Sequence, residues 1–208
     1  SSFSTGSINC SGDYVGGLVG SSINYSVINN TYSNCNINGS DRVGGLVGNN
    51  ELRSLILDSY ATGFVSGDSV GCGGGLVGDN DNSTINKSFA TGEVFGDGGG
   101  IADTLLNGGV LHDCYWYDNA GDDALGCYRS GPGAAEGGGN TNCTEKTDIT
   151  WFYDVSNGPM GSWDFDITWD DVDDGYNYPP LRGEASARVE VRMTHPSGDT
   201  NVTLNEFF

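Results

Sequence analysis

The sequence predicts an all-β fold: a parallel β-helix, or β-solenoid, built from glycine-rich repeats of 25–30 residues. Three observations support this prediction. A glycine-rich pentapeptide recurs along the chain, short apolar stretches alternate with turn residues, and 35 glycines occur together with 8 Phe, 10 Tyr and 4 Trp. This aromatic content is sufficient for a packed core, so the many glycines do not indicate disorder.

Three anchors define the repeat. The pentapeptide GGLVG spans residues 16–20, 44–48 and 74–78, and a weaker copy, GGIAD, spans residues 99–103. A second anchor ends in an aromatic residue, at Thr31-Tyr32, Ser59-Tyr60, Ser88-Phe89 and Cys114-Tyr115. A third anchor aligns Ile8, Ile37, Val65 and Val94. Self-similarity at a fixed period of this length is typical of solenoids and related repeat folds.

The spacing of the apolar residues predicts three short strands in each repeat. The apolar stretches are too short for helices, and they contain β-branched and aromatic residues. A unit of this size cannot bury its own apolar side, so we expect the repeats to stack as coils about 4.8 Å apart. Inside the stack we expect a ladder formed by Leu18, Leu46, Leu76 and Ile101. A β-sandwich would explain the strands but not the recurring pentapeptide.

Composition divides the chain into three regions. Residues 1–117 contain the repeats, and residues 118–183 contain a loop-rich segment followed by an aromatic and acidic cap. In residues 184–208, apolar and polar side chains alternate on both sides of a turn, which predicts a C-terminal β-hairpin or strand pair. We expect this pair to pack on the solenoid, to belong to a truncated further domain, or to insert into a neighbouring subunit. The residues expected to form the intersubunit strand are Val189, Val191, Met193, Val202, Leu204 and Phe207.

The net charge of −20 excludes two classes of partner. With 28 acidic and 8 basic residues, the chain has little that could bind nucleic acid or an anionic membrane surface. No apolar run is long enough to span a membrane. One interpretation of the charge is a high-salt habitat, in which ions screen the self-repulsion of a halophilic protein. The alternative is an ordinary acidic secreted protein with aspartate-rich turns.

Six cysteines predict disulfide bonds. They are dispersed and form no CxxC pair, so the sequence contains neither a zinc ribbon nor a thioredoxin-type motif. An even number of dispersed cysteines is typical of proteins in an oxidising compartment. Among the connectivities open to six cysteines, we favour Cys10–Cys35 on adjacent coils, Cys127–Cys143 across a loop, and Cys72–Cys114.

Eight Asn-x-Ser/Thr sequons also indicate an extracellular location. Asn, Ser and Thr are common in this chain, so chance explains some of the sequons, but their density supports a glycosylated exterior. The candidate acceptors are Asn9, Asn24, Asn29, Asn38, Asn82, Asn86, Asn142 and Asn201.

The repeat resembles a known family, the GLUG-motif repeats, which are named for a Gly-Leu-apolar-Gly core. This family occurs in bacterial and archaeal surface proteins, including adhesins, haemagglutinin-like proteins and accessory regions of extracellular proteases. Three copies here are similar to the motif. In the fourth, Ala102-Asp103 replaces the final Val-Gly, and we interpret this copy as a terminal capping coil. The segment from Trp163 to Arg182 looks like the tail that follows such repeats. The resemblance covers residues 5–183 and implies a surface location and a repeat fold, but no activity.

A column of aspartates is the candidate metal site. Asp13, Asp41, Asp68 and Asp97 follow a strand in successive repeats, and stacked carboxylates could bind calcium because calcium accepts several oxygen ligands at flexible geometry. They could equally be turn residues that bond to their own backbone, which is the interpretation we favour. A later acidic run, from Asp164 to Gly175, lacks the EF-hand spacing and is interpreted as a solvated loop. We predict no other cofactor.

No catalytic site is predicted. The motif HExxH is absent, and His112 and His195 lie outside any recognisable nucleophile context. A solenoid enzyme that cleaves polysaccharides would need paired carboxylates, and no pair of aspartates is singled out by its spacing. The aromatic runs 115–117 and 151–153 could stack on sugars, but we favour their use as covers for an open solenoid end.

We therefore expect a non-enzymatic extracellular protein on the surface of a prokaryote, and we favour an archaeal host. The expected role is that of a structural subunit, which assembles head-to-tail with copies of itself into a surface filament or pilus-like fibre. The alternative is an adhesin or carbohydrate-binding region of a larger surface protein, with surface glycans as partners. A polysaccharide-cleaving solenoid enzyme ranks third.

Overall fold

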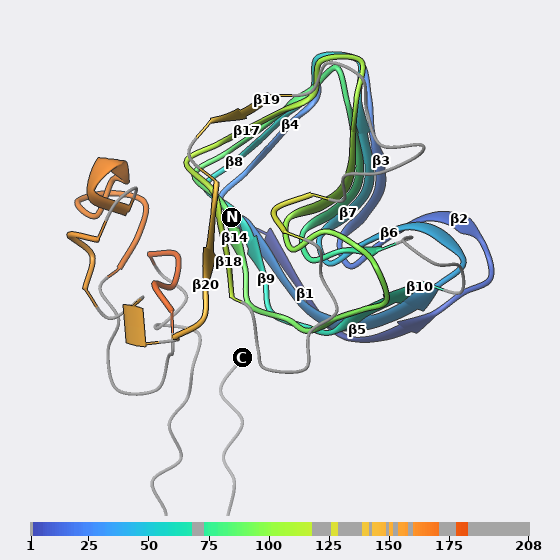
Figure 1. Ribbon diagram of the computed structural model, residues 1–208, viewed down its shortest axis with the longest axis horizontal. Coiled ribbons are helices and arrows are strands. Elements are labelled where there is room, and N and C mark those ends of the chain that lie inside the picture. The colour runs from blue at the N-terminus through green and yellow to red at the C-terminus, as the bar shows by residue number, and fades with distance from the viewer. Residues whose placement is uncertain are drawn as a thin grey trace, which may run out of the picture.

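The fold is that of a parallel β-solenoid, which confirms the predicted fold class. The structure, a computed structural model, describes residues 2–67, 73–117, 126–128, 139–141, 143–148, 150–151, 154–157, 160–170 and 178–182. These residues form about four turns of solenoid (Figure 1). They contain no α-helix, and the helical turn η2 (Met160–Ser162) has 3₁₀ geometry. No helix in this part of the chain is long and apolar enough to cross a membrane.

Four parallel sheets, A to D, make up the coils. Sheet A contains β1 (Ser2–Asn9), β5 (Thr31–Gly39), β9 (Tyr60–Ala61), β10 (Val65–Gly67), β14 (Phe89–Ala90), β15 (Val94–Phe95), β18 (Tyr115–Tyr117) and β20 (Thr144–Lys146). Sheet B contains β2 (Asp13–Gly16), β6 (Asp41–Gly44) and β11 (Gly73–Gly74). Sheet C contains β3 (Val19–Ser22), β7 (Val47–Glu51), β12 (Val77–Asp81) and β16 (Ala102–Leu106). Sheet D contains β4 (Val27–Asn29), β8 (Leu55–Leu57), β13 (Thr84–Asn86), β17 (Val110–His112) and β19 (Gly139–Thr141).

Sheet B is the element that the sequence did not predict. Three strands per repeat were expected, and the short strand that leads into each GGLVG copy and includes its first glycine is a fourth. The register confirms the third anchor, because Ile37 lies opposite Ile8 on one side and Val65 on the other, and Val65 lies opposite Val94.

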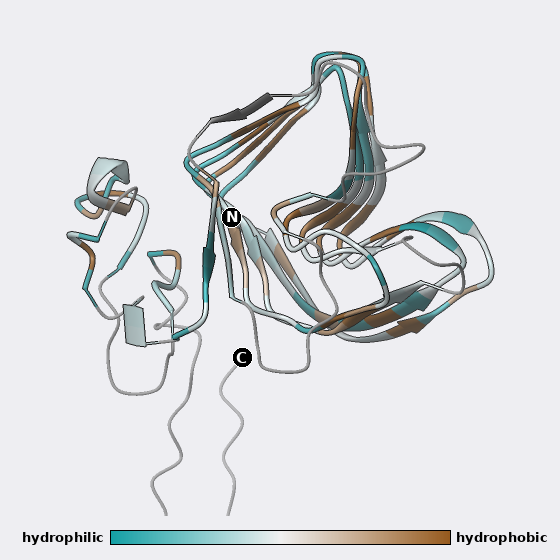
Figure 2. Ribbon diagram, in the orientation of Figure 1, coloured by the Kyte–Doolittle hydropathy of each residue, from teal (hydrophilic) through white to brown (hydrophobic). Residues whose placement is uncertain are grey.

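The coils enclose two apolar cores. The larger core combines residues of sheets A, C and D and contains the predicted ladder: Leu46, Leu76 and Ile101 are fully buried, and Leu18 packs against them partly buried. The smaller core lies between sheets A and B and includes Val43. Figure 2 shows apolar residues as brown stripes that repeat from coil to coil along the strands.

A waist of glycines separates the two cores. A Cβ atom at Gly45 would overlap the carbonyl oxygen of Gly75 and lie 2.8 Å from the Cβ of Ala61 in sheet A. A Cβ atom at Gly75 would in turn overlap the carbonyl oxygen of Gly100 and lie 3.0 Å from the Cβ of Ala90. Backbone approaches these positions so closely that a residue with a Cβ does not fit. This close approach explains the glycine pair that opens each pentapeptide.

A partial fifth coil covers the GGIAD repeat. β19 pairs with β17, and β20 pairs with β18. The carbonyl oxygen of Cys127 accepts hydrogen bonds from the backbone N–H of Ile101 at 3.0 Å and of Ala102 at 3.1 Å. The GGIAD repeat is therefore not terminal, which corrects the prediction of a capping coil. Sheets A and D also continue past residue 117, where the sequence placed the end of the repeat region.

An aromatic ladder runs along the outer face of sheet A. The rings of Phe3, Tyr32, Tyr60 and Phe89 stack in series, with successive centroids 5.2, 5.0 and 4.7 Å apart. The residues that follow them in the strands, such as Ala61, point into the larger core. Alternation along the strands therefore places the aromatic rings outside the solenoid and the small residues inside.

The tail packs against the side of this ladder. Trp163 and Trp169 lie 6.0 and 5.7 Å from the ring of Phe89, and Tyr178 lies 5.5 Å from it. In Figure 1 the orange segment lies beside β20, in agreement with these contacts. We call residues 160–170 and 178–182 the lateral cover. An open-end cover was predicted for the runs 115–117 and 151–153, whereas the lateral cover is a later segment that packs on the side of the stack, where the outer aromatic ladder provides its apolar partner.

Asp58 links the lateral cover to the solenoid and makes stability depend on pH. The indole Nε1 of Trp169 donates a hydrogen bond to Asp58 Oδ1 at 3.1 Å. Burial raises the pKa of the Asp58 carboxyl above its ordinary value, although the bond from Trp169 opposes this shift. Because the pKa is higher in the folded state, the stability that this group contributes is complete below its unfolded pKa of about 4. This contribution is lost as the pH rises through the folded pKa.

We therefore expect the substitution Asp58→Asn to raise the melting temperature at pH 7. Asparagine keeps an acceptor for Trp169 and carries no charge to desolvate. The gain should shrink as the pH falls through the folded-state pKa toward about 4, below which the wild-type carboxyl is protonated in both the folded and the unfolded state. Asp154→Asn is the control, because hydrogen bonds from Ser156 lower the pKa of that exposed carboxyl. We therefore expect this substitution to lower the melting temperature at pH 7, not to raise it. Thermal unfolding followed between pH 3 and 7 would contradict this account if Asp58→Asn melted below the wild type at pH 7.

Candidate functional site

Strand β1 presents an edge that has no partner among the described residues. Its other edge pairs with β5 along all 8 residues. The N–H of Cys10, directly after β1, donates to the carbonyl oxygen of Asn38 at 3.0 Å. Backbone groups alternate sides along a strand, so the N–H groups of Thr5, Ser7 and Asn9 point toward the free edge. This edge can accept a further strand.

The first coil, residues 2–29, exposes apolar side chains that later coils bury. Phe3 is 57% exposed, whereas Tyr32, which lies directly opposite it in β5, is 8% exposed. The other large exposed side chains of this coil are Tyr14, Ile23, Tyr25 and Val27. Each is an apolar group that a neighbouring coil or another chain could cover.

The first coil is also nearly free of charge. The chain carries 28 acidic and 8 basic side chains, but residues 2–29 contain a single charged residue, Asp13. A net charge of −20 opposes the close approach of two copies through like-charge repulsion. The first coil, with its single charge, is therefore a region through which two copies can approach at low electrostatic cost.

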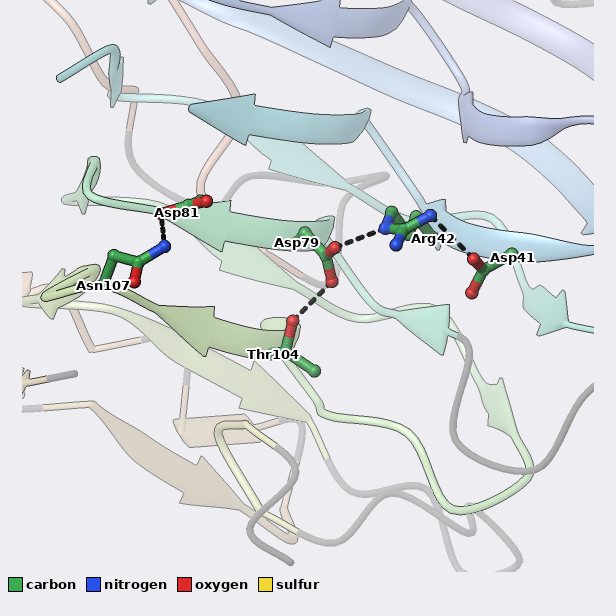
Figure 3. A network of polar contacts seen from close by, with 6 residues as sticks. All are labelled: Asp41, Arg42, Asp79, Asp81, Thr104 and Asn107. Carbon is green, nitrogen blue, oxygen red and sulfur yellow. Dashed lines mark hydrogen bonds and ion pairs between the residues drawn. The ribbon is translucent and has the colours of Figure 1, made fainter. Parts of the chain in front are cut away.

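A polar network ties coils 2 to 4 together on the side formed by sheets B and C (Figure 3). The guanidinium of Arg42 donates to Asp41 at 2.8 Å and to Asp79 at 2.7 Å, and it lies 5.0 Å from the ring centroid of Tyr14. The other carboxylate oxygen of Asp79 accepts a hydrogen bond from the hydroxyl of Thr104. Because these contacts run between coils, the network reinforces the stack.

The candidate calcium residues do not form one column. Asp13 and Asp41 lie opposite each other in β2 and β6, and the carboxylate of Asp41 binds Arg42. Asp97 is shifted by one residue relative to the register of sheet B, and Asp68 lies outside the described residues. In the described ranges, no group of three or more His, Cys, Asp or Glu could hold a metal ion.

Of the predicted disulfides, the structure contains Cys127–Cys143, with Cα atoms 6.2 Å apart. The predicted pair Cys10–Cys35 is wrong, because both thiols are free. Cys35 lies opposite Gly6 in the register of β1 and β5. Cys10 is four residues further along, which places the two Cα atoms about 14 Å apart, well beyond the reach of a disulfide.

The predicted pair Cys72–Cys114 is also wrong, since Cys114 is a free, buried thiol; Cys72 lies outside the described residues. Cys114 Sγ donates to the carbonyl oxygen of His112 at 3.3 Å, and burial raises its pKa to about 12. The equivalent residues of earlier coils are Ser59 and Ser88, whose hydroxyls donate in the same way to the carbonyl two residues before them. Cys114 thus takes the place that Ser59 and Ser88 occupy in the earlier coils, with a thiol instead of a hydroxyl.

Most of the described sequons are accessible. Asn86 is half-buried, and Asn142 and Asn201 lie outside the described residues. The exposed acceptors are Asn9, Asn24, Asn29, Asn38 and Asn82.

The residues considered for chemistry make local contacts. His112 Nδ1 lies 3.1 Å from a carboxylate oxygen of Asp113, and His195 lies outside the described residues. In the acidic run, Asp164 Oδ1 accepts backbone hydrogen bonds from its own turn, at 3.0 and 2.9 Å. The first aromatic run divides: Tyr115 faces outward and its ring lies 4.6 Å from that of Trp151 in the second run, whereas Trp116 points inward against Gly100.

Two features of the molecular surface were not predicted from the sequence. The nearly uncharged first coil could have been found from the distribution of charge along the chain. The exposed pair Phe64 and Phe95 could not, because these residues are 31 positions apart and meet only through the stacking of coils. The predicted intersubunit residues Val189, Val191, Met193, Val202, Leu204 and Phe207 all lie outside the described residues.

Comparison of the chain with protein-family models, with curated proteins and with solved structures finds no match in any of the three. The β-solenoid is therefore established by its own strand register. The resemblance to GLUG repeats continues to rest on the sequence motifs alone.

Proposed function

We propose that the protein is an extracellular structural subunit that assembles head-to-tail into a surface filament or pilus-like fibre. The observation that carries this proposal is the open, uncharged edge of the first coil. An unpaired strand edge offers a row of main-chain donors and acceptors to an incoming strand. A head-to-tail contact between different surfaces does not close on itself and so produces an open polymer.

The acceptor in this proposal is β1, and the donor is the C-terminal strand pair of a second copy. Val189, Val191 and Met193 alternate with polar residues, as a strand with one apolar side requires. Between residues 187 and 208 the chain carries two arginines, two glutamates and one aspartate, which is close to neutral. Neither partner then brings the strong negative charge of the rest of the chain to the joint.

Three observations support an extracellular setting. The Cys127–Cys143 disulfide fits an oxidising compartment. Five exposed sequons fit a glycosylated surface, and the GGLVG repeats resemble those of prokaryotic surface proteins.

The cross-coil network around Arg42 and the ladders of stacked side chains suit a rigid element that bears mechanical load.

A backbone substitution at the free edge tests the proposal. We expect Thr5→Pro to abolish end-to-end assembly, because proline removes an N–H that points away from β5 and so spares the existing pairing. Thr5→Ala is the matched control, since it also removes the hydroxyl but keeps the N–H. Light scattering coupled to size-exclusion chromatography, with electron microscopy of the same samples, measures the assembly.

Filaments that persist in Thr5→Pro would contradict the role of the β1 edge. Deletion of residues 187–208 tests the donor separately and should leave single particles. If both variants still form filaments, the joint lies elsewhere. If the wild-type protein forms no assembly over a range of salt concentrations, the structural-subunit proposal fails and the adhesin alternative replaces it.

A further inference from the structure

Phe64 and Phe95 form an exposed aromatic pair on the outer face of sheet A. They are 38% and 44% exposed, and their rings meet edge to face with centroids 5.8 Å apart. Their chain neighbours Val65 and Val94 are buried, so both phenylalanines point outward. The exposed residues of the adjacent strand β5 on this face are polar, namely Asn36 and Asn38. Two adjacent phenyl rings exposed among polar residues indicate a site that another group contacts.

The sequon at Asn38 lies beside this pair. Asn38 is opposite Ser66, and Ser66 is opposite Phe95 in the next strand. Asn38 is exposed and follows the buried Ile37, so its side chain points to the same face as the two rings. Strand spacing places Asn38 and Phe95 about 10 Å apart at their Cα atoms, and the diagonal from Asn38 to Phe64 spans about 8 Å.

Ser66 occupies the position between the acceptor and the rings. It is a small residue in a column whose other members are Asn9, Asn38 and Phe95. Phe64 lies two residues before it on the same face of the chain. The first sugar of a glycan attached to Asn38 would lie above Ser66, where its C–H face can contact both rings.

We propose that Asn38 carries an N-linked glycan whose first sugar packs against Phe64 and Phe95. This inference rests on the extracellular setting of the proposed function. The contact joins the apolar face of a sugar to an aromatic face, the same chemistry by which proteins bind free sugars. Such a contact is weak for a free glycan, but a covalent link holds the sugar at a high effective concentration beside the rings. For this reason the occupant is the protein's own glycan and not one captured from solution.

The experiment uses the full chain secreted from a eukaryotic cell line, which modifies accessible sequons. Glycopeptide mass spectrometry should find Asn38 occupied. Ser40→Ala removes the sequon and leaves Asn38 unchanged. We expect this variant to melt about 2–4 °C below the glycosylated wild type, which is the shift typical of one modest contact in a chain of this size.

Two comparisons separate ring packing from a general effect of glycosylation. In a Phe64→Ser, Phe95→Ser background, the addition of Ser40→Ala should no longer change the melting temperature. Asn29→Gln, which removes another exposed sequon at a position of β4 with ordinary strand backbone, should leave it unchanged in the wild-type background.

An unmodified Asn38, whatever the other sequons carry, overturns the inference. So does a glycan whose removal shifts the melting temperature equally with and without the two rings. Neither result bears on end-to-end assembly, which is measured on the edge variants Thr5→Pro and Thr5→Ala.

Discussion

Replacement of Gly75 by alanine is expected to lower the free energy of unfolding by about 3 kcal/mol or more. The new Cβ would overlap the carbonyl oxygen of Gly100 and lie 3.0 Å from the Cβ of Ala90. Backbone atoms cannot rotate away as the end of a long side chain can, so the coils must move apart at the waist. Urea-induced unfolding, followed by far-ultraviolet circular dichroism, measures the loss as a lower midpoint.

Gly161→Ala is the control for this prediction. Gly161 is exposed, and a Cβ there would have its nearest neighbour, the carbonyl oxygen of Ser156, at 3.4 Å, which is an ordinary contact. We expect a change within about 0.5 kcal/mol, as for most surface substitutions. If Gly75→Ala and Gly161→Ala unfolded at the same urea concentration, the tight waist would not be the reason for the glycine pair.

Truncation of Phe89 to alanine is expected to cost about 3–5 kcal/mol and to loosen the lateral cover. The ring of Phe89 is fully buried, with its centroid 4.7 Å from Tyr60, 6.0 Å from Trp163 and 5.7 Å from Trp169. Alanine leaves a cavity between the ladder and the cover. Trp163 and Trp169 then gain water contact, so the tryptophan fluorescence of the native protein should shift to the red along with the loss of stability.

Phe95→Ala is the matched control, because Phe95 belongs to the same sheet but is 44% exposed. In unglycosylated protein we expect it to cost less than about 1 kcal/mol and to leave the tryptophan emission unchanged. An emission spectrum of Phe89→Ala that matches the wild type would mean that the cover does not depend on the ladder.

The pentapeptide illustrates how far sequence reasoning reached. Its period predicted the stacking of coils, and the leucine or isoleucine at the third position of each copy predicted an apolar ladder inside the stack. Which strand lies against the two glycines from across the coil could not be read from the sequence. The answer depends on sheet A, whose residue Ala61 approaches Gly45 from across the coil. That residue belongs to a different strand, and its position depends on the path of the whole coil.

The cysteines show the opposite case. Cys10 and Cys35 were paired because their spacing is close to one repeat, and repeat spacing does place residues on adjacent coils. The register, however, sets Cys35 opposite Gly6. A shift of four residues along a strand is small on the scale of a repeat but large compared with the reach of a disulfide. Approximate periodicity therefore predicts neighbouring coils but not neighbouring side chains.

The sequence by itself determined the fold class, the repeat and the ladder residues, because period and alternation are local patterns that a stacked parallel sheet must satisfy. The tertiary structure alone decided the fourth sheet, the free cysteines, the partial fifth coil and the side on which the tail packs. Each of these depends on the register between coils and on which face of a strand points outward. Alternation reports that Tyr115 and Trp116 face opposite ways, but only the closed coil shows that Trp116 is the residue inside.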